Sequence, residues 1–447
     1  MRMSLAVTIV AAASISGRPA YAQVNPRLDE ETARALSKVD QAVGVREIPP
    51  LVSPQCGTCQ NLGPWPGVPL SRRFQLTFDD LEWQVSMWNT GPKGLWLGPV
   101  LVKRRTDSEW RTVLKSAGLA ELFVPYDNGG PRPSDVRFCP APNGCLVPID
   151  AADLPPGRGD LVTLSGDSEP RVAVECADRG IGWMCKGPYG NQRRRGQEVV
   201  FWFVIDGGNY DNIIQYVFRD DGVIGFRAGA TGYNDPAHST LTHVHNLLWR
   251  IDVDVEDADN NIVVLSDHIE SDGNDDAYMD LSVPAFEMAL DWLPNTFRTL
   301  KVMNPNTLAG YTLSPWHLTG ISRHFGADEV WTQHDYYLTR YHPGEDGSGP
   351  WGPNSWRSVW SSPDNYLLIY ANTNASLLAT SPEPLYGDIV LWARSSLLHE
   401  PHTEDRSLTS PPGEFTGITL MHWSGFDLIP DDFFDANPLG APERCGP

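Results

Sequence analysis

A run of short apolar segments separated by turn residues constrains this chain more than any other feature. From about residue 72 onward, many of these segments are β-branched or aromatic and under nine residues long, which favours strands over helices. The clearest are "RFQLTF", "GLWLGPVLV", "EVVFWFVI", "NIIQYVF", "VIGF", "LLWRIDVDV", "NYLLIYA" and "DIVLWA". The chain also holds 40 Gly and 38 Pro for turns and 16 Trp for a core. We therefore predict an all-β fold, a large antiparallel β-sandwich over residues 72–447.

Few segments have a helical pattern. The best candidate within the β region is "SEWRTVLKSAGLAELF" (108–123), which is a helix or two strands. A short amphipathic helix is predicted in "NPRLDEETARALSKVDQAV" (25–43). A linker rich in Pro, Gly and Cys follows it, so residues 23–71 are expected to form a short helix and a linker.

The first 22 residues have the pattern of an export signal. A basic start and a short apolar core precede "AYA", so cleavage is expected after Ala22 and the protein is expected to be exported. The net charge of −22 argues against nucleic acid or an anionic membrane as partner, because both need basic patches. Such a charge would attract cations, including ammonium substrates, or it serves solubility alone.

Seven cysteines are present, and most should pair in an oxidising compartment. Seven is odd, so at least one is free or pairs with another chain. "CGTC" (56–59) resembles a redox or zinc motif, but no second pair follows at zinc spacing. It is interpreted as a structural or labile disulfide. The cysteines are Cys56, Cys59, Cys139, Cys145, Cys176, Cys185 and Cys445.

The stretch "GGNYDN" (207–212) encloses Tyr210 in small and polar residues at the end of an apolar run. One reading is a β-turn. The other is that the tyrosine is chemically modified and needs room.

Two histidines in "THVHN" point to a metal site. His243 and His245 are two apart at the start of a predicted strand, so their side chains share a face. Paired imidazoles suit Cu, Zn or Fe. A third ligand is required, and His399 in "LLHEPHTED" is the best candidate. His422 in "LMHWSGF" is an outside candidate, more simply read as an ordinary strand histidine.

Three aspartates form a second candidate site. Asp252 and Asp254 are also two apart, and Asp388 precedes a strand. Three carboxylates suit a hard cation such as Ca²⁺. Read in isolation, solvated aspartates at strand ends explain them equally well.

Together these motifs resemble the catalytic domain of the copper-containing amine oxidases. The resemblance covers roughly residues 72–440, with the motifs in the family's order. It rests on "NYDNIIQYVFRDDGVIGFRAGATG", "HVH", "RIDVDV" and "GDIVLWARSSLLHEPHTED", with lesser matches in "ELFVPY", "VMNPNTLAGYTLSP", "YYLTRYHPGE" and "DDFFDANPLG".

The resemblance implies a role for each candidate residue. Tyr210 would be the precursor of topaquinone and form the Schiff base with the amine. Asn209 would limit the orientation of its ring, and Tyr126 would hydrogen-bond a quinone oxygen. The three histidines would hold Cu(II), and the three aspartates a second ion, most simply Ca²⁺.

The implied reaction is oxidative deamination of a primary amine by O₂, giving an aldehyde, H₂O₂ and ammonia. The resemblance further implies a homodimer, and it places a disulfide between Cys176 and either Cys139 or Cys145.

Two departures from the family pattern bear on activity. Asp206 stands where the family usually has threonine. The family segment with the catalytic aspartate is not found after "VPY", which leaves Asp135 as the nearest substitute, with Asp127 and Asp150 behind it.

Three hypotheses follow: an active oxidase, a degenerate copper-binding relative with little or no turnover, and a plain secreted sandwich with incidental histidines. The ordered motifs favour the first two.

Overall fold

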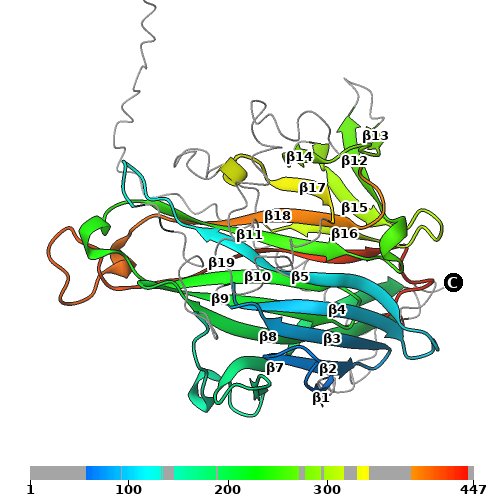
Figure 1. The fold of residues 1–447 in the computed structure, drawn as a ribbon, viewed down its shortest axis with the longest axis horizontal. Helices are drawn as coiled ribbons and strands as arrows, with labels where there is room; N and C mark the ends of the chain where they lie inside the picture. The colour runs from blue at the N-terminus through cyan, green and yellow to red at the C-terminus, as the bar shows by residue number, and fades with distance from the viewer. Residues whose placement is uncertain are drawn as a thin grey trace, which may run out of the picture. The chain divides into compact units, whose positions relative to one another are not determined.

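Two antiparallel sheets dominate the computed structural model of this chain (Figure 1). The structure describes residues 57–91, 93–131, 133, 145–187, 190–270, 277–292, 296–316, 330–341 and 384–440. The expected signal peptide, the helix over 25–43 and the strand "NYLLIYA" lie outside these residues. All described strands belong to the unit Pro54–Pro447.

The first sheet has nine strands, and every pairing in it is antiparallel. In spatial order they are β1 (Thr58–Gly63), β2 (Ser71–Thr77), β3 (Leu81–Asn89), β4 (Leu95–Arg104), β5 (Arg111–Phe123), β11 (His243–Val253), β18 (Ile389–His399), β17 (Tyr336–Arg340) and β14 (Met288–Leu290).

The second sheet has ten strands, again all antiparallel. In spatial order they are β13 (Ala277–Ser282), β12 (Ile262–Glu270), β15 (Thr299–Met303), β16 (Gly310–Pro315), β19 (Ile418–Asp431), β10 (Ile224–Tyr233), β9 (Tyr210–Arg219), β8 (Gly190–Asp206), β7 (Pro170–Gly187) and β6 (Gly159–Thr163).

Helical structure among the described residues is limited to short 3₁₀ turns. They are η1 (Ala151–Asp153), η2 (Pro236–His238), η3 (Ala258–Asn260), η6 (Val330–Gln333) and η7 (Thr403–Asp405). None of the described helices has the length and apolarity needed to cross a membrane. The prediction of an all-β fold is therefore confirmed. The ambiguous segment 108–123 resolves as one long strand, β5, and the expected linker contains strand β1.

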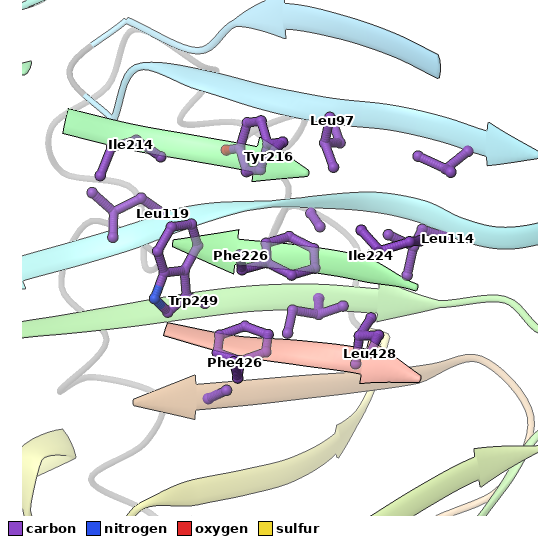
Figure 2. Close-up of a cluster of buried hydrophobic side chains, with 14 of the residues drawn as sticks. Leu97, Leu114, Leu119, Ile214, Tyr216, Ile224, Phe226, Trp249, Phe426 and Leu428 are labelled. Atoms are coloured by element: carbon purple, nitrogen blue, oxygen red, sulfur yellow. The ribbon is translucent and has the colours of Figure 1, made fainter. Parts of the chain in front are cut away.

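The core lies between the two sheets, and aromatic side chains fill much of it (Figure 2). Phe226 of β10 stacks on Phe426 of β19 with ring centroids 5.0 Å apart, and it meets Trp249 of β11 edge-on at 5.7 Å. The Tyr216 hydroxyl on β9 donates a hydrogen bond to the Leu95 carbonyl of β4 at 2.5 Å. The Phe226–Trp249 and Tyr216–Leu95 contacts join strands of different sheets, and the Phe226–Phe426 pair packs at the interface between the sheets. Together these contacts hold one sheet against the other.

Strand β11 is buried along its whole length. One face contributes Trp249 to the main core. The other contributes Leu248 to a smaller cluster with Trp331, Tyr337 and Trp392. A strand covered on both faces is fixed in position more firmly than an edge strand, which suits it to carry a site.

The prediction of a disulfide at Cys56–Cys59 is wrong for Cys59, whose thiol is free. Cys59 lies on β1, opposite Leu76 of β2, and its side chain packs against the core. Burial, with Asp160 adding to it, raises the pKa of this thiol to about 12. Cys145, Cys176 and Cys185 are disulfide-bonded. The specific pairing of Cys176 stays a prediction, and Cys139 lies outside the described residues.

Candidate metal centre

The register of β11 against β18 brings the predicted histidines together. His243 and His399 are direct partners across this strand pair, and His245 follows two residues along β11. His243 Nε2 lies 3.4 Å from His399 Nδ1, and the ring centroids of His243 and His245 are 5.2 Å apart. All three side chains are buried. The three imidazoles, far apart in sequence, thus meet at one end of the sandwich.

Tyr210 approaches these imidazoles from the opposite sheet. Its ring centroid lies 4.7 Å from that of His245, 5.4 Å from His243 and 6.3 Å from His399. The phenol lies 3.1 Å from His399 Nδ1 and donates a hydrogen bond to Asn234 Oδ1 at 2.9 Å. Burial raises the pKa of this phenol, and the neighbouring Tyr126 and Asp405 raise it further.

The local backbone explains why Tyr210 sits at this place. It is the first residue of β9, after a tight turn in which its carbonyl accepts a hydrogen bond from the Gly207 amide at 2.8 Å. Gly208 has φ +94°, a conformation that glycine adopts readily. Asp206 Oδ1 accepts from the Gly208 amide at 2.7 Å. The "GGNYDN" stretch is thus a turn, and it also directs one tyrosine into a buried site.

Asn209 supports this turn. Its side chain makes no hydrogen bond to the Tyr210 ring in this structure. Its Nδ2 donates to the Tyr233 carbonyl at 2.8 Å. Gly232 pairs with Tyr210 across the hairpin, and an added Cβ there would lie 2.2 Å from the Asn209 carbonyl oxygen. Asn209 and Gly232 therefore position the backbone on either side of Tyr210.

The three imidazoles suit a bound metal ion. Both ring nitrogens of His245 are buried without a hydrogen-bond partner, which is costly unless something else occupies them. Burial lowers the pKa of His243 to about 4 and also lowers the pKa values of His245 and His399. Each shift favours the neutral ring, whose lone pair is available to an ion. This donor set fits Cu, Zn or Fe.

Asp405 orients His399, and sequence reasoning did not assign it a role. Its Oδ2 lies 3.0 Å from His399 Nε2, which leaves Nδ1 to face Tyr210 and His243. A carboxylate that holds the outer nitrogen of a metal-ligating imidazole fixes its orientation and raises its basicity. Asp405 follows His399 by six residues in "HEPHTED", a spacing that does not by itself predict this contact.

Asn234 is the second residue that sequence reasoning missed. It is fully buried, it accepts from the Tyr210 phenol, and its Nδ2 donates to the Phe415 carbonyl at 3.0 Å. It thereby ties the phenol to the loop before β19.

Tyr126 lies beside the three imidazoles, and its predicted hydrogen bond to a quinone oxygen stays a prediction. Its backbone bridges to His243, and its ring stacks on that imidazole with centroids 4.3 Å apart and an interplanar angle of 16°. The stacking restricts the His243 ring, whose Nε2 points toward His399.

The predicted base, Asp135, lies outside the described residues. Asp127 and Asp150, the two alternatives, serve local turns. Asp127 Oδ1 accepts from the Asn128 amide at 2.6 Å, and Asp150 Oδ1 accepts from the Ala152 amide at the start of η1. Neither contact directs a carboxylate toward the phenol.

The three predicted aspartates also converge. One carboxylate oxygen from each of Asp252, Asp254 and Asp388 lies within 4.8 Å of the others. The Oδ1 atoms of all three are buried without a hydrogen-bond partner, as expected of oxygens awaiting a hard cation.

Two basic side chains already contact this aspartate cluster. Lys115 Nζ lies 3.0 Å from Asp388 Oδ2, and the buried Arg250 donates to Asp252 Oδ2 at 3.0 Å. Burial nevertheless raises the pKa values of Asp252 and Asp254. Burial thus outweighs the stabilisation that Lys115 and Arg250 give to these carboxylates.

Comparison with known proteins identifies the family that this chain matches. The family model "Copper amine oxidase, enzyme domain" matches residues 177–443. A primary amine oxidase of Klebsiella aerogenes is 26% identical, over 81% of this chain and 54% of its own length. Copper amine oxidase 1 of Aspergillus niger is 24% identical, over 73% of this chain and 53% of its own. The chain therefore spans about half the length of these curated relatives.

Solved structures show the same fold. A copper-containing benzylamine oxidase from Hansenula polymorpha matches with a TM-score of 0.62 and 18% identity, over 82% of this chain and 60% of its own. An amine oxidase of Aspergillus nidulans matches with a TM-score of 0.60 and 20% identity, over 82% of this chain and 52% of its own.

The contact between Asp405 and His399 yields a prediction. Asp405→Asn should weaken copper binding about 10–100-fold, the usual cost of losing such a partner. Copper affinity of the purified apoprotein, measured by competition with a chelator, tests this. Glu404→Gln is the matched control, because Glu404 is an exposed acidic neighbour in the same turn. Equal affinities in the two variants would contradict the orienting role.

Proposed function

This chain belongs to the copper amine oxidase family, and from that premise we propose that it is an exported, copper- and topaquinone-dependent primary amine oxidase. The proposed reaction converts a primary amine and O₂ to an aldehyde, H₂O₂ and ammonia. The observation that carries the proposal is the convergence of three buried imidazoles of one sheet on a single buried phenol of the other.

The chain's own residues have separable tasks in this proposal. His243, His245 and His399 would hold Cu(II), and Tyr210 would be converted to the quinone. With both groups bound, copper supports the chemistry with O₂ and the quinone supplies the electrophilic carbonyl for the amine. The described side chains would orient the copper ligands and the quinone and exclude water from them.

Three contacts hold the phenol and the imidazoles in place. Asn234 holds the phenol, Asp405 holds His399, and Tyr126 covers one face of His243. Because these partners are themselves buried, little water reaches the imidazoles, and their interactions with charge are stronger than they would be in solvent.

Proton abstraction requires a base, and we assign it to Asp135. The residue follows the Tyr126 segment in sequence, and the two other candidates serve turns of their own. A substrate that is an ammonium in solution suits a chain with net charge −22.

The aspartate cluster is proposed to bind Ca²⁺, with Lys115 turning aside or sharing the carboxylates. We also propose a homodimer, which sedimentation analysis would test against a monomer.

Copper loading tests the proposed function directly. The apoprotein incubated aerobically with Cu²⁺ should develop a quinone detectable by redox-cycling stain, and it should then release H₂O₂ with at least one amine of a small panel. Tyr210→Phe should bind copper yet give neither signal. A quinone that forms without peroxide from any amine would favour the degenerate copper-binding relative instead. No quinone in the wild type would reject the proposal.

The assignment of the base has its own test. Asp135→Asn should lower kcat by about 10²–10⁴-fold while quinone content stays normal, because general-base catalysis contributes about that much. Asp127→Asn and Asp150→Asn are the controls and should retain the wild-type rate. Unchanged turnover in Asp135→Asn would remove this residue from the reaction.

The aspartate cluster predicts stabilisation by calcium. Ca²⁺ at about 100 times its Kd should add about 2.7 kcal/mol to the free energy of unfolding through binding to the folded state alone. Thermal unfolding with Ca²⁺ and with a chelator would measure this, and Asp254→Asn should abolish most of the difference. Asp435→Asn is the control, since its side chain is 93% exposed. A melting temperature that does not change with Ca²⁺ would contradict the calcium site and leave Lys115 and Arg250 as the cations of this cluster.

A further inference from the structure

Two histidines outside the proposed copper site lie close to His399. One ring nitrogen of each of His399, His402 and His422 lies within 4.8 Å of the others. The ring centroids are 5.7 Å apart for His399–His402, 5.4 Å for His399–His422 and 6.4 Å for His402–His422. The three come from different places: the end of β18, the residue before η7, and β19.

The two ring nitrogens of His399 face different neighbours, and we call the two sides of the ring the inner side and the outer side. Its Nδ1 faces the phenol and His243, as described above. Its Nε2 faces Asp405, whose Oδ2 also accepts from the His402 amide at 3.0 Å and lies 3.9 Å from His402 Nδ1. His402 and Asp405 are thus grouped on the side of His399 that faces away from Tyr210.

Two buried atoms in this group lack a hydrogen-bond partner. They are His422 Nε2 and Asp405 Oδ1, and Asp405 is fully buried. His402 engages the Glu400 carbonyl through Nδ1, which leaves its Nε2 available to a ligand. A buried nitrogen and a buried carboxylate oxygen without partners, next to two further imidazoles, are the donors that a transition-metal ion would satisfy.

We propose that His402 and His422, with the outer nitrogen of His399, form a second binding site for a divalent transition-metal ion. We call this the outer site, and Asp405 is its adjoining carboxylate. Three imidazoles and a carboxylate suit Zn²⁺ or Cu²⁺. The outer site shares His399 with the proposed copper site. An ion there displaces the Nε2 proton that Asp405 accepts, which is released to solvent, so a His399 ring that binds both ions is an imidazolate. The outer site requires neither Tyr210 conversion nor amine oxidation.

The geometry requires a modest adjustment. Nitrogens bound tetrahedrally to one ion at about 2.1 Å lie about 3.4 Å apart. Ligand atoms that now lie within 4.8 Å of one another therefore need to close by up to about 1.4 Å. The His402 side chain is 44% exposed and has room to make that movement.

The outer site also lies on the more exposed side of the centre. His243, His245 and His399 are each at most 2% exposed, whereas His402 is open to solvent. An ion arriving from solvent can therefore meet His402 before it meets the buried imidazoles.

Metal stoichiometry of the full-length apoprotein tests the outer site. Titration with Zn²⁺ alone, and separately with Cu²⁺ alone, should give two ions per wild-type chain after removal of loosely bound metal. His402→Ala/His422→Ala should bind one, and so should His243→Ala/His245→Ala, which keeps the outer ligands. His268→Ala, an exposed histidine on β12, is the control and should bind two.

A single variant and EPR spectra distinguish the loss of a metal ligand from misfolding of a double variant. His402→Ala alone alters an exposed side chain and should weaken the second ion at least tenfold, with the melting temperature near that of the wild type. Cu²⁺ bound to His243→Ala/His245→Ala should give an EPR spectrum distinct from that of His402→Ala/His422→Ala.

The outcomes separate this proposal from the proposed function. One ion per chain in the wild type, or no ion in His243→Ala/His245→Ala, would overturn the outer site. The quinone stain reads the inner site independently, so an absent quinone with two bound ions would reject the oxidase and retain the outer site.

Discussion

The register between β11 and β18 is the constraint on which the site depends. It sets His243 opposite His399, and a slip of one residue would turn every side chain of one strand to the other face. Buried polar contacts specify this register. Ser396 donates to Asn246 across the pair at 2.9 Å, and Trp249 donates to Ser395 at 2.9 Å. The same strand pair carries Asp252 near its other end, so one register positions both candidate ion sites.

Several buried polar atoms at these sites lack a hydrogen-bond partner. Folded proteins leave few such atoms, because each costs about 1–3 kcal/mol. Here they include both ring nitrogens of His245 and the Oδ1 atoms of Asp252, Asp254 and Asp388. The well-packed aromatic core between the sheets offsets that cost, and bound ions would remove it. These polar groups are thus arranged in a way that a bound cation would stabilise.

The sequence predicted the fold class and the convergence of its histidines because these follow from simple periodicities. Short β-branched runs predict strands, and two residues at i and i+2 share a face, as His243 and His245 do. It could not reveal Asn234 or Asp405, because their roles depend on where loops return in space. It also misassigned Cys59, since a short Cys spacing says nothing about which side chain a sheet turns inward. The aspartates were recognised as a cluster, but the approach of Lys115 from β5 depends on strand order.

Asp405 contacts residues of both the proposed copper site and the outer site. Its Oδ2 holds the outer nitrogen of His399, and through that ring it determines which nitrogen faces Tyr210. The same carboxylate fixes the His402 backbone and retains one unsatisfied oxygen. An ion in the outer site would draw on the His399 nitrogen that Asp405 now holds, so binding there would change the basicity of the imidazole facing the phenol. Because both nitrogens belong to one ring, an ion in the outer site would affect the inner site without movement of either sheet.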